Sequence, residues 1–372
     1  MQLLVIGDAF SPYTVAFSRF LKQHSPIITI DIINTRHNVS DIDLTDHIRG
    51  AYDQFYPGQS ISAITSQINE KICQYDVICL HGFWDVVLSI YERLNHKDLF
   101  TVGVIWGSDF YRRNHDTMPL SGIFDRCDRV LVQTDEMEAD LLKVYPLLPK
   151  KIRKCLFGIE PLESLTAMSG ISSAKAKRSL GLASDSFVLT CGYNASPFQN
   201  HTAIIDQLTA IISRLPANHV LIFPFTYQKD TRYMSLIENV MKKSPLTYYF
   251  IEDFMDSEQV SLLCLATDIF IQVQTTDALS ASMREHLFAK SIVITGGWLP
   301  YQILVRNGFY FETIDELNSL GTTITGILDN YTEVKRKVEL YNTPDKFEQY
   351  RWPKVIQPWY EAFLEYQTEK RD

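Results

Sequence analysis

Two carboxylates, Asp277 and Glu285, stand eight residues apart in the stretch TTDALSASMREHLFAKSIVITGG. This stretch predicts a polar strand end, a helix that starts at Ser280–Ser282 and continues over Met283–Ala289, and a buried strand over Ile292–Thr295. A helix that begins at the carboxyl end of a strand points unpaired backbone N–H groups and its positive dipole end into the crevice above the sheet. Such an arrangement can bind phosphate, and the two carboxylates can accept hydrogen bonds from sugar hydroxyls. The pattern therefore indicates a nucleotide-sugar site.

The elements that would position this site follow a regular alternation of short apolar runs and amphipathic stretches. Strands are expected at Leu3–Ile6, Ile27–Ile33, Val77–Leu80, Thr101–Ile105, Arg129–Val132, Phe187–Cys191, His219–Phe223, Thr247–Phe250, Asp268–Val273 and Ile292–Thr295. Helices are expected between them, for example at Thr14–Gln23, Ile61–Cys73 and Asp135–Val144. Strand–helix alternation predicts α/β architecture, with parallel sheets covered on both faces and ligands bound beyond the carboxyl ends of the strands.

A length of 372 residues predicts two domains. The segment Glu163–Lys177 is polar and rich in small residues, and it interrupts the alternation. We therefore expect a linker over 163–178 between a first domain, 1–162, and a second domain, 179–344. The C-terminal stretch YRWPKVIQPWYEAFLEY is expected to be helical in places, with Pro353 and Pro358 kinking or dividing it.

Composition and charge indicate a globular protein and argue against a nucleic-acid-binding or membrane-spanning one. Hydrophobic residues make up 46% and charged residues 21%, which is typical of globular chains. The net charge of −9 argues against nucleic acid as the main partner, because phosphate neutralisation needs a concentrated basic face. The start, MQLLVIGDAF, is expected to be a first strand rather than a signal peptide, and no apolar run approaches the ~20 residues that span a bilayer.

The cysteines indicate the cellular compartment. They are scattered, without CxxC or paired spacing, and indicate buried reduced thiols of a cytosolic protein. We expect a cytoplasmic protein whose contact with the inner face of the membrane, if any, is peripheral. The cysteines are Cys73, Cys79, Cys127, Cys155, Cys191 and Cys264.

The run Phe254–Tyr301 resembles the donor-binding half of GT-B glycosyltransferases, especially the large retaining group with two glutamates separated by seven residues. In that pattern a strand ends in an acidic residue, a helix opens with small residues, and Glu-Ala-Met-Ala-x-Gly precedes a strand of the PVIAT type. The corresponding residues here are Asp277, 278–280, 284–290 and 291–295. The resemblance implies a GT-B fold: two doubly wound Rossmann-like domains facing across a cleft, with a C-terminal helix, 345–372, crossing back to the first domain.

The resemblance also implies roles for individual residues. Glu285 would hold the ribose hydroxyls of the donor, and Asp277, as a catalytic residue, would lie near the transferred sugar. Asp277 replaces the usual glutamate, which shortens its reach by one methylene. The diphosphate would be held by backbone N–H groups and hydroxyls of Leu279, Ser280, Ala281 and Ser282. The alternative is a surface aspartate followed by a core helix with an exposed glutamate.

The loop CGYNASPFQNHTAI departs from the family pattern. Gly192 fits, but Tyr193 and Asn194 stand where a basic residue is expected. Neutral groups would then bind the phosphate oxygens without a fixed charge. The candidates are Asn194, Ser196, Asn200 and His201 for neutral contacts, with Lys229 and Arg232 of the next strand–helix loop for the positive charge. The alternative for each is a solvated loop residue.

The first domain contributes two motifs, LHGFW at 80–84 and VIWGSDFYRR at 104–113. Together they resemble the HGL…WGxDLY pattern of bacterial surface-polysaccharide transferases. Asp109 is the best candidate for an acceptor-side hydrogen bond or proton acceptor, and His81 is the second. A single histidine is more often structural than catalytic, so a core role for His81 stays open.

The basic cluster PLLPKKIRK at 146–154, with Arg112 and Arg113 earlier in the chain, would suit lipid-phosphate acceptors in anionic membranes or form a solvated loop. Zinc-ligand spacing, a P-loop and Gly-x-Ser-x-Gly are missing from the sequence. We therefore expect no metal and no cofactor beyond the nucleotide-sugar substrate.

These patterns lead to one expectation and two alternatives. The expectation is a metal-independent, hexosyltransferase-like glycosyltransferase that moves a sugar from a nucleotide-sugar donor to a glycan or lipid-linked acceptor with retention, in bacterial capsule, O-antigen or other polysaccharide biosynthesis. The alternatives are a nucleotide-sugar epimerase and a non-catalytic GT-B-like subunit that binds glycan or a partner transferase. The missing basic residues and the Asp-for-Glu change favour the subunit.

Overall fold

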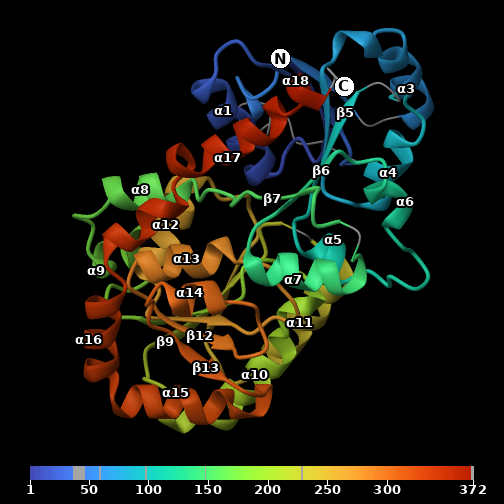
Figure 1. The fold of residues 1–372 in the computed structure, drawn as a ribbon. Coiled ribbons are helices and arrows are strands. Elements are labelled where there is room, and N and C mark those ends of the chain that lie inside the picture. Colours follow the sequence, from blue (N-terminus) through green and yellow to red (C-terminus); the bar gives the residue numbers. More distant parts are fainter. Residues whose placement is uncertain (37–46, 58–59, 97–98, 147, 228, 370–372) are drawn as a thin grey trace. The chain divides into compact units, whose positions relative to one another are not determined.

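The computed structural model describes residues 1–36, 47–57, 60–96, 99–146, 148–227 and 229–369. The chain divides into two compact units. The first comprises Met1–Gly158 and Gln349–Asp372, and the second comprises Ile159–Glu348. Each unit contains one sheet flanked by helices, and every strand pairing described in either sheet is parallel (Figure 1).

The first unit is built on a sheet of order β3-β2-β1-β4-β5-β6-β7. Its strands are β1 (Gln2–Gly7), β2 (Thr29–Asn34), β3 (Gln54–Tyr56), β4 (Val77–His81), β5 (Phe100–Val104), β6 (Arg129–Val132) and β7 (Ile152–Lys154). β1, β4 and β5 carry apolar residues on both faces because helices cover both sides of a parallel sheet. The chain runs outward from β1 to β3 and returns to β4, so the topological switch lies between β1 and β4.

Helices of the first unit include one from the far end of the chain. They are α1 (Pro12–His24), α3 (Ile61–Asn69), α4 (Asp85–Tyr91), α5 (Ser108–Tyr111), α6 (Ser121–Phe124), α7 (Asp135–Val144), α17 (Trp352–Leu364) and α18 (Tyr366–Glu369). α17 packs against α1, as the red and blue ribbons of Figure 1 show. The ring centroids of Phe17 and Trp359 lie 5.0 Å apart. The predicted return of the C-terminal helix to the first unit is thus confirmed.

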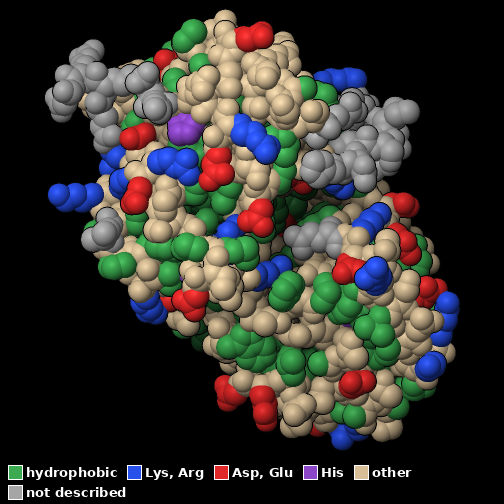
Figure 2. Space-filling model, turned by 90° about the vertical axis from the view of Figure 1, so that its right-hand side faces the viewer, with side chains coloured by type: hydrophobic (Ala, Val, Ile, Leu, Met, Phe, Trp, Pro, Cys, Tyr) green, Lys and Arg blue, Asp and Glu red, His purple; other side chains and the backbone are tan. Residues whose placement is uncertain are grey.

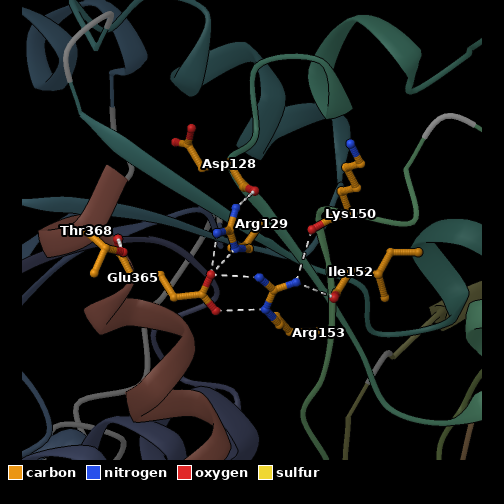
Figure 3. A network of polar contacts seen from close by, with 7 residues as sticks. All are labelled: Asp128, Arg129, Lys150, Ile152, Arg153, Glu365 and Thr368. Atoms are coloured by element: carbon orange, nitrogen blue, oxygen red, sulfur yellow. Dashed lines mark hydrogen bonds and ion pairs between the residues drawn. The ribbon is translucent and has the colours of Figure 1, made fainter. Parts of the chain in front are cut away.

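α17 continues through Pro358, which the sequence analysis expected to kink or divide it, whereas Pro353 lies in its first turn. Six side chains of α17 are buried, and this packing offsets the backbone hydrogen bond that Pro358 cannot donate. The helix is also fixed at its end by Glu365, which accepts from Arg153 Nε at 2.7 Å and forms an ion pair with Arg129 (Figure 3). These two arginines belong to β7 and β6, so the tail is tied to the edge of its own sheet.

The second unit is built on a sheet of order β10-β9-β8-β11-β12-β13. Its strands are β8 (Phe187–Cys191), β9 (His219–Pro224), β10 (Tyr248–Ile251), β11 (Ile269–Gln272), β12 (Ile292–Gly296) and β13 (Glu312–Ile314). Its helices are α8 (Pro161–Ala167), α9 (Ser173–Ser179), α10 (His201–Ala210), α11 (Thr231–Lys243), α12 (Ser257–Ala266), α13 (Ala281–Phe288), α14 (Gln302–Arg306), α15 (Leu320–Asp329) and α16 (Tyr331–Tyr341). The switch lies between β8 and β11, where the loops after both strands meet.

The segment 163–178 forms most of α8 and α9 rather than an irregular linker. Both helices pack against α12 of the second unit. Lys177, only 6% exposed, forms a 2.7 Å ion pair with Asp268 at the start of β11. The segment therefore belongs to the second unit, and the chain passes between the units near 158–159.

Candidate functional site

The start of α13 is the central feature of the candidate site. Ser280 caps the helix, and its hydroxyl accepts the Met283 N–H at 3.1 Å. Within the described residues, the backbone N–H groups of four residues here have no hydrogen-bond partner, which is the usual state of a helix N-terminus. The four are Leu279, Ser280, Ala281 and Ser282. They stand at the carboxyl end of β11, beside the topological switch, and form a row of donors suited to an anion.

Arg284 fixes the backbone of this turn by donating to its carbonyl groups. Its Nε donates to the Ser280 carbonyl at 3.1 Å and its Nη2 to the Leu279 carbonyl at 3.2 Å. The side chain is 1% exposed, so the guanidinium is a buried support. This role is not predictable from the sequence, because an arginine inside a helix usually faces solvent.

Glu285 lies on α13 and is 7% exposed. The exposed glutamate of the alternative interpretation is therefore wrong for this side chain. Burial raises the pKa of Glu285 to about 7, although Arg284 opposes the shift. Among the described residues no hydrogen bond is made to its carboxylate. A buried carboxyl with a perturbed pKa and free acceptor capacity is typical of a functional site.

Asp277 lies in the loop before α13, and protein donors contact both of its oxygens. Oδ1 accepts the Ala278 N–H at 2.8 Å, and Oδ2 accepts the Tyr301 hydroxyl at 2.5 Å. Tyr301 is buried in the loop after β12 and also accepts from Gln272 Nε2 at 3.3 Å. The sequence analysis did not identify Tyr301 or Gln272 as site residues, because only the tertiary fold brings these segments together.

The loop after β8 begins with Gly192 at φ +64°. A Cβ atom at this position would lie 2.6 Å from Gln199 Oε1, so the loop folds closely over its own side chains. His201 is fully buried, with Nδ1 bonded to the Tyr233 hydroxyl and Nε2 to the Cys191 carbonyl, each at 3.2 Å. Burial lowers the pKa of His201 to about 3. The predicted phosphate contact does not fit this geometry, because both ring nitrogens already bond to the protein.

The three remaining neutral candidates of this loop also bond to the protein backbone. Asn194 Oδ1 accepts the Ser196 N–H at 3.0 Å, and Ser196 Oγ accepts the Phe198 N–H at 3.4 Å. Asn200 Nδ2 donates to the Val273 carbonyl at 2.7 Å, which joins the loop to the residues after β11. These side chains shape the loop and hold it beside the loop that leads into α13.

Tyr193, which stands where the resemblance implies a basic residue, belongs to a network of neutral side chains. Gln274 Oε1 accepts from the Tyr193 hydroxyl and from Gln199 Nε2, each at 3.0 Å. Gln199 is 1% exposed and Gln274 is fully buried. Gln199 and Gln274 come from separate loops and complete a buried network with Tyr193, which no local sequence pattern indicates.

Lys229 and Arg232, the candidates for positive charge, lie beyond β9, which neighbours β8. Both side chains are exposed, and neither takes part in an ion pair within the described part of the chain. Asp230, between them, caps α11 instead, accepting the N–H groups of Arg232 and Tyr233 at 3.0 Å. The two cations are therefore not committed to internal contacts.

A hollow of about 430 Å³ opens at the carboxyl end of the same sheet. It is lined by Asn200, Thr275, Trp298, Asp315, Glu316 and Leu317, from the loops after β8, β11, β12 and β13. The Trp298 indole donates from Nε1 to the Gln274 carbonyl at 2.9 Å, which fixes the ring at its wall. An aromatic ring flanked by carboxylates and an amide can contact a sugar.

Asp109 of the first unit directs its carboxylate to the backbone. Oδ2 accepts the Phe83 N–H at 2.8 Å, and Oδ1 accepts the N–H groups of Trp106 and Gly107 at 3.0 and 2.9 Å. Burial raises the pKa of Asp109 while these hydrogen bonds oppose the rise. The side chain, 3% exposed, joins the loops after β4 and β5. This geometry differs from the acceptor contact expected from the sequence.

His81 lies at the end of β4 within a cluster of rings, 1% exposed. Nδ1 bonds to the Thr14 hydroxyl at 3.1 Å, and the ring stacks on Phe17 with centroids 5.4 Å apart. Burial lowers the pKa of His81 to about 3. The imidazole is therefore neutral near pH 7, and it cannot serve as a charged acid in this position. This favours the structural alternative.

The basic cluster 146–154 is largely used in internal contacts. Lys151 donates to the Asp125 carbonyl at 2.9 Å, Arg153 binds Glu365, and Lys154 pairs with Asp135 at 2.6 Å. On the face drawn in Figure 2, acidic and basic side chains of the described residues are interspersed. Two of the four basic side chains of the cluster, Arg153 and Lys154, are therefore paired with carboxylates.

Three further observations concern the whole described chain. All six cysteines are free, and all but Cys73 are buried. Within the residues described, no group of histidine, cysteine and carboxylate side chains could hold a metal ion. No helix in that part of the chain is long and apolar enough to cross a membrane.

Comparison with known proteins gives structural matches only. No protein-family model and no curated protein sequence matches the chain. The structure of HepE from Anabaena in complex with UDP and glucose superimposes with a TM-score of 0.76 at 12% identity, covering 98% of this chain and 99% of HepE. The chain has the GT-B fold.

Other structures support the same GT-B assignment. Sucrose-phosphate synthase from Thermosynechococcus elongatus gives a TM-score of 0.74 at 13% identity over 99% of this chain and all of that one. A proposed UDP-N-acetylglucosamine 2-epimerase from Listeria monocytogenes gives 0.63 at 13% identity, covering all of this chain and 97% of the other. Since these identities are low, the GT-B likeness establishes the fold, and the activity has to be inferred from the site.

Proposed function

We propose that the chain is a glycosyltransferase that moves a sugar from a nucleotide-sugar donor to a glycan or lipid-linked acceptor. The observation that carries this proposal is the start of α13, where four unpartnered backbone N–H groups precede the buried Glu285 on one helix. Phosphate and ribose are joined in a nucleotide, and a donor row followed by an acceptor carboxylate matches that order of groups. The GT-B fold supports the proposal.

In this proposal the leaving nucleoside diphosphate binds at Leu279–Ser282. The backbone N–H groups and the positive end of the α13 dipole stabilise the negative charge that develops as the sugar–phosphate bond breaks. Lys229 and Arg232, which the structure leaves uncommitted, contribute the cationic charge. These groups would do the work that a metal ion does in other transferases, so the transfer is metal-independent.

The two carboxylates, Glu285 and Asp277, bind different parts of the donor. Glu285 accepts hydrogen bonds from the ribose hydroxyls, and Asp277 contacts the transferred sugar next to the reacting carbon. Transfer with retention, in bacterial polysaccharide biosynthesis, is the finer part of the proposal and rests on the sequence resemblance. HepE is a structural neighbour seen with UDP-glucose, so UDP-sugars are the first donors to test.

Slow donor hydrolysis tests this function directly. The protein is incubated with UDP-, GDP-, TDP- and ADP-sugars, and released nucleoside diphosphate is measured. We expect release from one donor class, and its loss in Glu285→Ala. Glu258→Ala is the matched control, because Glu258 is an exposed glutamate in the first turn of α12 in the same unit. Absence of both release and binding across the panel would contradict the proposal.

One observation favours a different class of function. Tyr193 stands where the family pattern has a basic residue, and its network with Gln199 and Gln274 is neutral, which would weaken leaving-group stabilisation. A non-catalytic subunit would bind a nucleotide and release no product with any acceptor. An epimerase would instead change the configuration of the free sugar nucleotide, which proton NMR of the same incubation would detect.

A further inference from the structure

Asp277 is oriented by a phenol that no sequence pattern marks. The Tyr301 hydroxyl donates to Asp277 Oδ2 at 2.5 Å from the loop after β12, on the far side of α13 in the sequence. Tyr301 is 2% exposed. A hydrogen bond from a buried neutral donor to a carboxylate is among the stronger ones in proteins, so this contact restricts the carboxylate more than a solvent-exposed contact would.

The phenol is itself held by the sheet. Gln272, the last residue of β11, donates from Nε2 to the Tyr301 hydroxyl at 3.3 Å. The Gln272 carbonyl in turn accepts the Thr295 hydroxyl of β12 at 2.9 Å. Hydrogen bonds from the Gln272 side chain through Tyr301 therefore connect Asp277 to β11, and the Gln272 backbone is itself bonded to β12.

Protonation of the phenol does not vary near neutral pH. Burial raises the pKa of Tyr301 well above its ordinary value, and the nearby Asp277 carboxylate raises it further. Tyr301 thus keeps its proton, and because Gln272 supplies a donor to the same oxygen, that proton is directed at Asp277. The phenol acts as a fixed donor and not as a base.

The second oxygen of Asp277 is fixed in a different way. Oδ1 accepts the N–H of Ala278, which directly precedes the row of free N–H groups at the start of α13. With one oxygen tied to this turn and the other to Tyr301, the plane of the carboxylate is set relative to the anion-binding turn.

We propose that Tyr301 is a positioning residue for Asp277, and that it orients this carboxylate toward the transferred sugar of a bound sugar nucleotide. The inference rests on the proposed function. An aspartate is one methylene shorter than the glutamate of the family pattern, so it reaches less far and depends more on being held in one orientation. Tyr301 contacts Asp277 and not the expected diphosphate site, so its effect should fall on sugar transfer and not on nucleotide binding.

The test is Tyr301→Phe, which removes the hydroxyl and keeps the ring. With the sugar nucleotide that the wild-type protein hydrolyses fastest, we expect kcat to fall about 10- to 100-fold, since small misplacements of a reacting group cost about this much. KM and the affinity for the free nucleoside diphosphate should stay within about threefold. A loss of structure alone would weaken nucleotide binding as well.

Tyr331→Phe is the matched control. The Tyr331 hydroxyl donates to Asp268 Oδ1 at 3.4 Å, also a phenol–carboxylate contact in the second unit, but at the start of β11, where the strand enters the sheet. This variant should keep wild-type kcat. Gln272→Met, which leaves the phenol but removes its supporting donor, should lower kcat less than Tyr301→Phe does, and it serves as the second variant if Tyr301→Phe does not fold.

A double-mutant comparison identifies the partner. If Tyr301 acts through Asp277, then Asp277→Asn combined with Tyr301→Phe should be no slower than Asp277→Asn alone. Additive losses, or an unchanged kcat in Tyr301→Phe while the wild type is active, would overturn this inference and leave the proposed function standing. A wild-type protein that turns over no sugar nucleotide would overturn the proposed function, and this inference with it.

Discussion

Replacing Glu285 by glutamine should stabilise the second unit at pH 8 and leave its stability nearly unchanged at pH 4. Glu285 is 7% exposed, and burial raises its pKa from 4.5 to about 7. Between these two values the folded protein keeps the proton that the unfolded chain has already lost. The free energy of unfolding therefore falls as pH rises through this window, and the loss is complete above about pH 7.

The expected gain in unfolding free energy follows from how far the pKa of Glu285 is raised. A displacement of about 2.5 pKa units corresponds to about 3 kcal/mol at about 1.4 kcal/mol per unit. Glutamine has nearly the same shape and no charge, so it avoids this cost. The stability difference between Glu285→Gln and the wild type should grow from near zero at pH 4 to about 3 kcal/mol at pH 8.

The assay is urea unfolding at each pH. The unfolded fraction of the second unit is measured by a short pulse of hydrogen–deuterium exchange, always at the same pulse pH, in peptides from β11 and β12. Glu258→Gln, at an exposed position in the same unit, is the control and should show no comparable pH-dependent gain. Equal stability of Glu285→Gln and wild type at pH 8 would refute the reasoning, because it would mean that Glu285 ionises there without a desolvation cost. In the active protein, donor affinity should rise from pH 5 to pH 7, and the glutamine variant should lose this dependence.

Three further substitutions test the framework around the site. Glu365→Ala should cost the first unit about 3 kcal/mol in urea unfolding, since it leaves two partly buried arginines without their carboxylate. Burial raises the pKa of Glu365, but the two arginines lower it more, so the pKa lies below 4.5 in the folded protein. The difference in unfolding free energy between wild type and Glu365→Ala should therefore disappear as pH falls below that value. A difference that stays constant with pH would contradict this. Asp109→Asn should lower the melting temperature without any substrate present, at a cost of about 2 kcal/mol, because the amide has one acceptor oxygen and its NH2 group would face a backbone N–H; an unchanged melting temperature would argue for a purely functional role. Gly192→Ala should cost more than Gly181→Ala, since both have positive φ but only the Gly192 Cβ would meet other atoms; equal losses in urea unfolding would show that the loop adapts.

Much of the fold could be predicted from apolar runs alone. All ten predicted strands are present, and each predicted end lies within two residues of the observed one. Among the described residues, the three strands that were not predicted, β3, β7 and β13, have three residues each, and each lies at the edge of its sheet. A strand this short has too few side chains to show a period of two, and an edge strand is not apolar on both faces. β7 also lies within a run of basic residues, which gives no apolar pattern.

The candidate site was predictable only where local sequence determines it. The places of Ser280 and Glu285 on α13 could be predicted because a helix start and its first turns lie within one short stretch. Arg284, Gln274 and Tyr301 were missed because their roles depend on contacts between loops. His201 shows the converse: its position in a loop motif suggested a ligand contact, while the fold places its ring in the core.

The split composition of the first unit has a consequence for biosynthesis. Gly158 and Gln349 are separated by the 190 residues of the second unit, and α17 is made only after all of them. At ribosomal rates of about 5–20 residues per second, roughly 10–40 seconds pass between these points. During that time the apolar face of α1 that later covers Trp359 has no partner, while the continuous second unit can already fold. The nascent chain is therefore expected to complete its second half first and to present a temporary binding site for chaperones on its first.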